Sequence, residues 1–82
     1  TLFPYTTLFR STLRFTETSD IVEFVNAASK CDFDIDVKYN RWYLDAKSIL
    51  GIMGIGVRNN FEVYFDGKDK QFQKVLDKFA VV

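Results

Sequence analysis

One stretch decides how this chain folds: Asp69-Lys70-Gln71-Phe72-Gln73-Lys74-Val75-Leu76-Asp77-Lys78-Phe79. Its four large apolar residues follow the i, i+3, i+4, i+7 spacing of one face of an α-helix. Asp69 stands at its start, where the helix dipole favours a negative charge. Burying each apolar side chain is worth roughly 1.5–3 kcal/mol, so we expect this helix to be essential to the small domain that a chain of 82 residues can form.

A second apolar stripe lies earlier in the chain and predicts another helix, ending near residues 29–31. The stripe consists of Ile21, Phe24, Val25 and Ala28. Asp20, with Glu23 three residues later, has the spacing of a capping box in which Asp replaces Ser or Thr. These two residues therefore mark the expected start of the helix.

Three segments alternate apolar and polar residues with the period of two that is typical of half-buried strands. Their apolar members are Leu13 and Phe15, then Phe33, Ile35 and Val37, and finally Phe61, Val63 and Phe65. A further strand is expected from Trp42 to Ala46, after a turn at residues 39–41, with Leu44 facing inward. Trp42 and Tyr43 are expected to be partly exposed on this strand.

Residues 46–56 are apolar, contain three glycines and include a single hydroxyl, that of Ser48. We predict a short helix with Ser48 as its N-cap, running to about Gly54 and leaving through a glycine-rich segment. An N-cap is worth about 1 kcal/mol. The sequence leaves open whether Ser48 is only this cap or also a site of regulation.

The expected order of elements is β-α-β-β-α-β-α. Strands with one apolar face and helices with one apolar stripe predict an α+β, two-layer, open-faced sandwich: a four-stranded antiparallel sheet with three helices on one face. Residues 12–82 are expected to form this single domain. Residues 1–11, TLFPYTTLFRS, do not fit the register and resemble a translated cloning or adapter sequence; the alternative is a genuine edge strand at residues 6–9.

The composition excludes several classes of function. Lys and Arg together number 11, as do Asp and Glu, so no overall field favours nucleic acid. No apolar run approaches the roughly 20 residues that span a bilayer, and no secretory signal pattern is present. Cys31 is the only cysteine, which excludes an internal disulfide and favours the cytoplasm.

Metal and cofactor chemistry is not expected either, and the chain does not read as an enzyme. The sequence has no histidine, which removes the most common general base and phosphoacceptor. Asp32, Asp34 and Asp36 recur at every second position, as the acidic ligands of an EF-hand calcium loop do. Such a loop has Gly at its sixth position and Glu at its twelfth, but counting from Asp32 these positions hold Val37 and Tyr43. We interpret the aspartates as the solvent-exposed face of a strand.

Several short motifs occur in a characteristic order from about Ser19 to Phe79. They are Ala27-Ala28-Ser29-Lys30, Tyr39-Asn40, Lys47-Ser48-Ile49 with Gly51, Met53 and Gly56, and Asp66-Gly67. With this spacing and element order the chain resembles the HPr family, the small phosphocarrier proteins of the bacterial sugar phosphotransferase system. The resemblance is closest to the Gram-positive branch.

The resemblance implies a first site, a phosphohistidine loop of pattern G-[LIV]-H-x-R-P at the start of the first helix. This chain departs from that pattern: Glu17 falls at the histidine position, Ser19 at the arginine and Asp20 at the proline. Carboxylates there would repel an incoming phosphoryl group, which needs an imidazole nucleophile and cationic or amide donors. We therefore do not expect phosphocarrier activity through this loop.

The resemblance also implies a second site, a regulatory serine phosphorylated by an ATP-dependent HPr kinase, and Ser48 matches it. In the family this surface then binds a sugar-responsive transcription regulator or another protein of the phosphotransferase system. The expected partner-binding residues beside Ser48 are Lys47, Ile49, Leu50, Ile52 and Met53. A monomer is expected rather than an oligomer.

Three functions remain open on this basis. The favoured one is a regulatory HPr-like protein that is phosphorylated on Ser48 and then binds a partner protein. The others are a phosphocarrier in which another residue replaces the histidine, and an HPr-fold interaction module that uses neither phosphorylation site.

Overall fold

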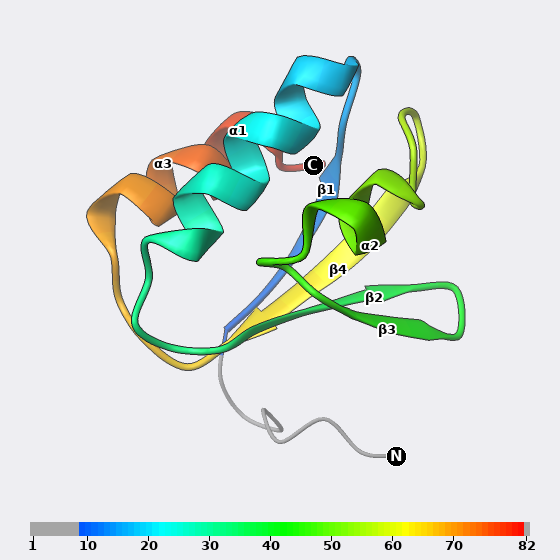
Figure 1. Cartoon of the computed structure of the whole chain (residues 1–82). Coiled ribbons are helices and arrows are strands. Elements are labelled where there is room, and N and C mark those ends of the chain that lie inside the picture. The colour runs from blue at the N-terminus through cyan, green and yellow to red at the C-terminus, as the bar shows by residue number, and fades with distance from the viewer. Residues whose placement is uncertain (1–8, 82) are drawn as a thin grey trace.

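The computed structural model of the chain describes residues 9–81 and confirms the expected order of elements. The elements are β1 (Phe9–Arg14), α1 (Thr18–Ser29), β2 (Ile35–Tyr39), β3 (Trp42–Asp45), α2 (Ile49–Met53), β4 (Asn60–Phe65) and α3 (Lys70–Phe79). The four strands form one antiparallel sheet in the order β1-β4-β2-β3. All three helices lie on one face of it (Figure 1), so the α+β open-faced sandwich is confirmed.

The strand register turns one face of the sheet toward the helices. Leu13 of β1 pairs with Phe61 of β4, and Val63 of β4 pairs with Val37 of β2; all four side chains are buried. The residues between them, such as Glu62, point to the opposite face because side chains alternate along a strand. The period-2 pattern in the sequence therefore predicted the core side of the sheet correctly.

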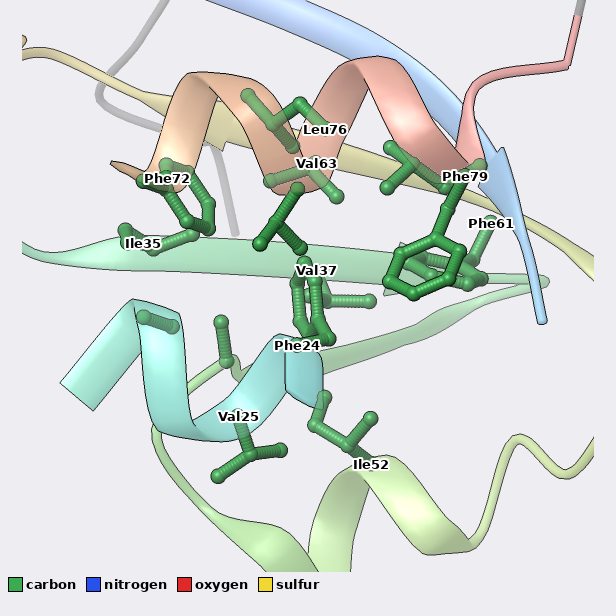
Figure 2. Close-up of a cluster of buried hydrophobic side chains, with 14 of the residues drawn as sticks. Phe24, Val25, Ile35, Val37, Ile52, Phe61, Val63, Phe72, Leu76 and Phe79 are labelled. Carbon is green, nitrogen blue, oxygen red and sulfur yellow. The ribbon is translucent and has the colours of Figure 1, made fainter. Parts of the chain in front are cut away.

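The two predicted apolar stripes face each other across the core (Figure 2). All four members of each stripe are buried, on α1 and α3 respectively. Their rings meet at Phe15, just after β1, whose ring centroid lies 4.7 Å from Phe61, 5.5 Å from Phe24 and 5.6 Å from Phe79. Sheet and long helices thus share one aromatic cluster, in the edge-to-face and tilted geometries that aromatic pairs prefer.

Strand β1 begins within the segment that we expected to lie outside the domain. Phe9 pairs with Phe65 and Ser11 with Val63, so the six residues of β4 all have partners in β1. The expected alternative of a strand at residues 6–9 is met only at Phe9, and residues 1–8 lie outside the described part of the chain. The adapter origin of residues 1–11 stays a prediction.

The predicted start of α1 is wrong by three positions. Glu17, not Asp20, is the N-cap, and Asp20 occupies the third helical position. There its carboxylate accepts a hydrogen bond from the Glu17 backbone N–H at 3.2 Å. Asp20 is therefore the returning half of a capping box that begins at Glu17, instead of the first half of one with Glu23.

Strand β2 also starts later than expected. Phe33 precedes it, half-buried, with its ring stacked on that of Phe65 at a centroid distance of 5.9 Å. The Phe33 ring also leaves no space for a side chain at Gly67, because a Cβ there would overlap the ring. Tyr39, expected in the turn, ends β2, and a two-residue turn with Asn40 at φ +55° leads into β3.

Candidate functional site

Ser48 lies at the start of α2, where the sequence predicts it. It is exposed, and its Oγ accepts a hydrogen bond from the Gly51 backbone N–H at 3.3 Å. Ser48 is thus the N-cap of a helix of five residues. Because Oγ acts as the acceptor in this bond, the hydroxyl proton is not used in the cap.

The turn before α2 is fixed by backbone and side-chain bonds. The Asp45 carboxylate accepts the Lys47 N–H at 2.9 Å, and the Asp45 carbonyl accepts the Ser48 N–H at 3.0 Å. Lys47 Nζ donates to the Cys31 carbonyl, just past α1, at 2.9 Å. These bonds hold Ser48 at a defined place beside the C-terminal end of α1.

Three of the predicted partner-binding residues form an exposed apolar patch on α2, which we call the α2 patch: Ile49, Leu50 and Met53. Leu50 is 84% exposed, far more than a large apolar side chain in a packed core element. Lys47, also predicted for this surface, is half-buried and tied to Cys31. An exposed apolar patch can bind a partner protein. Phosphorylation of the neighbouring Ser48 hydroxyl would add negative charge beside this patch.

Ile52 does not belong to the α2 patch, and its prediction as a partner-binding residue is wrong. It is fully buried and points from α2 toward Phe24 and Val25 of α1 (Figure 2). A helix that packs on a core must turn one side inward, and Ile52 is the only buried residue of α2. The sequence could not identify that side, because almost every position of the helix is apolar.

The second predicted location, at the start of α1, borders a surface cavity of about 600 Å³. Glu17, Ser19 and Asp20 all line it, so the structure brings these three predicted residues together. It also adds two cations that the sequence did not single out, Arg14 from β1 and Lys78 from α3. Only tertiary folding brings them here, and no local pattern marks either one.

Both cations of this cavity already have anionic or polar partners. Lys78 Nζ lies 2.9 Å from Glu23 Oε1, and this pair raises the pKa of Lys78. Arg14 Nε donates to Asn60 Oδ1 at 2.8 Å. The cavity therefore holds three carboxylates, those of Glu17, Asp20 and Glu23, and two cations that already have partners. The carboxylates would repel a phosphoryl group, so this is a poor environment for one.

Asp20 serves the fold in this cavity. Its Oδ2 accepts bonds from the backbone N–H and the hydroxyl of Thr16, both at 2.9 Å, as well as from Glu17. Burial raises the pKa of Asp20, but these hydrogen bonds outweigh it, and the pKa lies below its ordinary value. The carboxylate is thus held in its ionised form as a helix cap.

The two predicted sites are separated by α1. Glu17 begins this helix, whereas the Ser48 turn is tied to the residue after its C-terminal end. Twelve residues at 1.5 Å each span about 18 Å. The structure thus gives two distinct locations, with the apolar patch at one and the acidic cavity at the other.

Two properties of residues 9–81 bear on the class of the site. No helix there has the length and hydropathy needed to cross a membrane. Within the same residues, no group of three or more acidic or cysteine side chains is arranged to hold a metal ion.

Comparison with known proteins gives one family and a set of similar structures. The family model described as "PTS HPr component phosphorylation site" matches residues 20–82. HPr-C-His from Thermoanaerobacter tengcongensis is 25% identical and superposes with a TM-score of 0.69, over 87% of this chain and 93% of that one. The phosphocarrier protein HPr from Bacillus anthracis str. Ames shares the fold at 18% identity, also with a TM-score of 0.69, over 87% of this chain and 95% of that one.

We expect the Asp20→Asn variant to lose about 1 kcal/mol of unfolding free energy at pH 7, because it removes a charged capping acceptor. A carboxyl with a lowered pKa stabilises the fold above its unfolded pKa of about 3.9, and this contribution is lost as pH falls through the folded pKa. The difference between wild type and variant should therefore shrink below about pH 4. Urea unfolding at pH 7 and at pH 3 measures it.

Asp66→Asn, at an exposed carboxylate outside the helices, is the matched control and should change the unfolding free energy little at either pH. Equal losses in both variants, or a loss at Asp20 that is the same at both pH values, would contradict the capping role.

Proposed function

The chain belongs to the HPr family of the sugar phosphotransferase system, and from this premise we propose that it is a regulatory member, phosphorylated on Ser48, and not a histidine phosphocarrier. The observation that carries the proposal is the contrast between the two family sites. Ser48, which the resemblance places at the serine position, is an exposed hydroxyl beside the α2 patch, whereas Glu17, which the resemblance places at the histidine position, contributes a carboxylate to the cavity at the start of α1.

The modification is a phosphoryl transfer from ATP. Ser48 Oγ attacks the γ-phosphorus, the bond from this phosphorus to the β–γ bridging oxygen breaks, and ADP leaves. The hydroxyl proton passes to a base of the kinase. The cap leaves this chemistry possible, because the Gly51 N–H is donated to Oγ and the hydroxyl proton remains available.

Phosphorylation would change the charge of the α2 patch without a need to refold it. The phosphate adds a charge of about −1.5 to −2 at neutral pH. Leu50 and Met53 are 84% and 46% exposed, so they contribute contact area for a partner while the phosphate supplies specificity. The partner we propose is a sugar-responsive transcription regulator or another protein of the phosphotransferase system.

Incubation with ATP and a Gram-positive HPr kinase should add one phosphate, and peptide mass spectrometry should place it on Ser48. The Ser48→Ala variant should take up none. Ser19 and Ser29, which are also exposed, are internal controls and should stay unmodified. A kinase that labels its usual substrate but leaves Ser48 unmodified would contradict the proposal and favour an HPr-fold interaction module that uses neither site.

The Leu50→Ser variant should weaken binding of the phosphorylated protein to the regulator by about tenfold, because it removes the most exposed apolar side chain of the α2 patch. Val22→Ser, a 45% exposed position on α1, is the control and should bind like wild type. Titration calorimetry measures both. Equal affinities for wild type and Leu50→Ser would exclude the α2 patch as the contact surface.

A further inference from the structure

Lys47 stands where the chain passes from the core to the surface. Ala46, the residue before it, is fully buried, and its N–H donates to the Ile35 carbonyl at 2.9 Å. Ser48, the residue after it, is exposed and caps α2. A single residue therefore separates a position anchored in the core from the hydroxyl that we propose is phosphorylated.

The local bonds of this turn set its shape but do not place it against α1. Asp45 supplies two of them: its carboxylate accepts the Lys47 N–H at 2.9 Å, and its carbonyl accepts the Ser48 N–H at 3.0 Å. Both bonds join residues that lie within one stretch of four. They would keep the same geometry if the whole turn moved relative to α1.

The side chain of Lys47 makes the hydrogen bond that joins this turn to α1. Its Nζ donates to the Cys31 carbonyl at 2.9 Å, across 16 positions of the sequence. Cys31 follows the C-cap residue of α1 and is buried, and the negative end of a helix dipole favours a cation at such a place. A charge-assisted bond in partly buried surroundings is stronger than a bond between neutral groups.

This bond holds the start of α2, and with it the Ser48 hydroxyl. Ser48 Oγ accepts the Gly51 N–H at 3.3 Å and the Ser48 carbonyl accepts the Ile52 N–H at 3.0 Å, so Oγ is fixed to the first turn of the helix. Ile52 is fully buried and points toward α1 (Figure 2). Lys47 at the start and Ile52 further along thus attach this helix of five residues to α1 at two points.

We propose that Lys47 is a positioning residue for the phosphorylation of Ser48. Through the Cys31 carbonyl it holds the start of α2 against α1, so that Oγ meets the γ-phosphorus of ATP in line with the bond that breaks. Lys47 takes no part in the transfer itself, in which Oγ displaces ADP and the hydroxyl proton passes to a base of the kinase. The inference rests on the proposed phosphorylation of Ser48 and assigns Lys47 a role other than direct contact with the partner.

Positioning and direct contact predict different kinetics. A lysine that touched the kinase equally in the ground state and the transition state would raise KM on removal and leave kcat unchanged. A lysine that aligns Oγ acts in the transition state, so its loss lowers kcat. Alignment matters because a displacement of about 1 Å can cost about 100-fold in rate.

Steady-state phosphorylation with ATP and a Gram-positive HPr kinase tests this distinction. Lys47→Met keeps an unbranched stem but loses the ammonium, so kcat should fall about tenfold while KM stays within about twofold of wild type. Lys47→Arg, which can still donate to the Cys31 carbonyl, should keep most of kcat. Lys30→Met makes the same charge change at an exposed position beside Cys31 and, as the matched control, should behave like wild type. Thermal unfolding checks that each variant is folded.

Amide hydrogen exchange, measured by NMR without the kinase, gives an independent readout. The Gly51 N–H, which is bonded to Ser48 Oγ, should exchange about tenfold faster in Lys47→Met than in Lys30→Met. Unchanged exchange at Gly51, an unchanged kcat in Lys47→Met, or a change in KM alone would overturn this inference and leave the proposed function intact. A wild-type chain that the kinase leaves unmodified would instead overturn the proposed function, and the role of Lys47 with it.

Discussion

The rest of the structure depends on the packing of the Phe15 ring. This side chain is fully buried and contacts rings from β4, α1 and α3 at centroid distances of 4.7, 5.5 and 5.6 Å. Each of these elements has a single apolar face, so contact with Phe15 fixes which face turns inward. The polar faces then point to solvent, and function is left to the ends of the elements and to α2.

Helix α2 is the exception to this packing rule. Within the helix only Ile52 reaches the core; the buried Ala46 and Ile55 anchor the chain on either side, and polar bonds fix the preceding turn and join Lys47 to Cys31. A short helix secured in this way leaves Leu50 and Met53 to solvent without weakening the core. Such a surface suits a reversible partner, because a large core does not have to form or break with each binding event.

The start of α1 is a helix cap. There Glu17 and Asp20 form a capping arrangement that stabilises the first turn of the helix. The Asp20 carboxylate accepts hydrogen bonds from the backbone N–H and hydroxyl of Thr16 and from the Glu17 N–H, so it serves the fold at this position. The chain thus retains the fold of the family, and in the function that we propose this position caps a helix instead of carrying a phosphoryl group.

Most of the fold could be predicted from the sequence, because α1, α3 and the strands have clear apolar periodicity and the Ser48 cap has a standard local signature. Ile52 was misassigned, since a helix of nearly uniform apolar residues has no periodicity to show its buried side. The start of β1 was missed because it depends on pairing with distant β4. Arg14 and Lys78 of the acidic cavity were missed for the same reason, as only tertiary contacts bring them to Glu17.

The central claim is that this chain has lost the carrier site of its family. Incubation with phosphoenolpyruvate and the first enzyme of the phosphotransferase system, followed by intact-protein mass spectrometry, tests it most directly. The mass should remain unchanged, while a histidine-containing HPr in the same reaction gains one phosphate. A phosphate on this chain, stable or labile, would show that another residue has taken over the role of the histidine and would contradict the account.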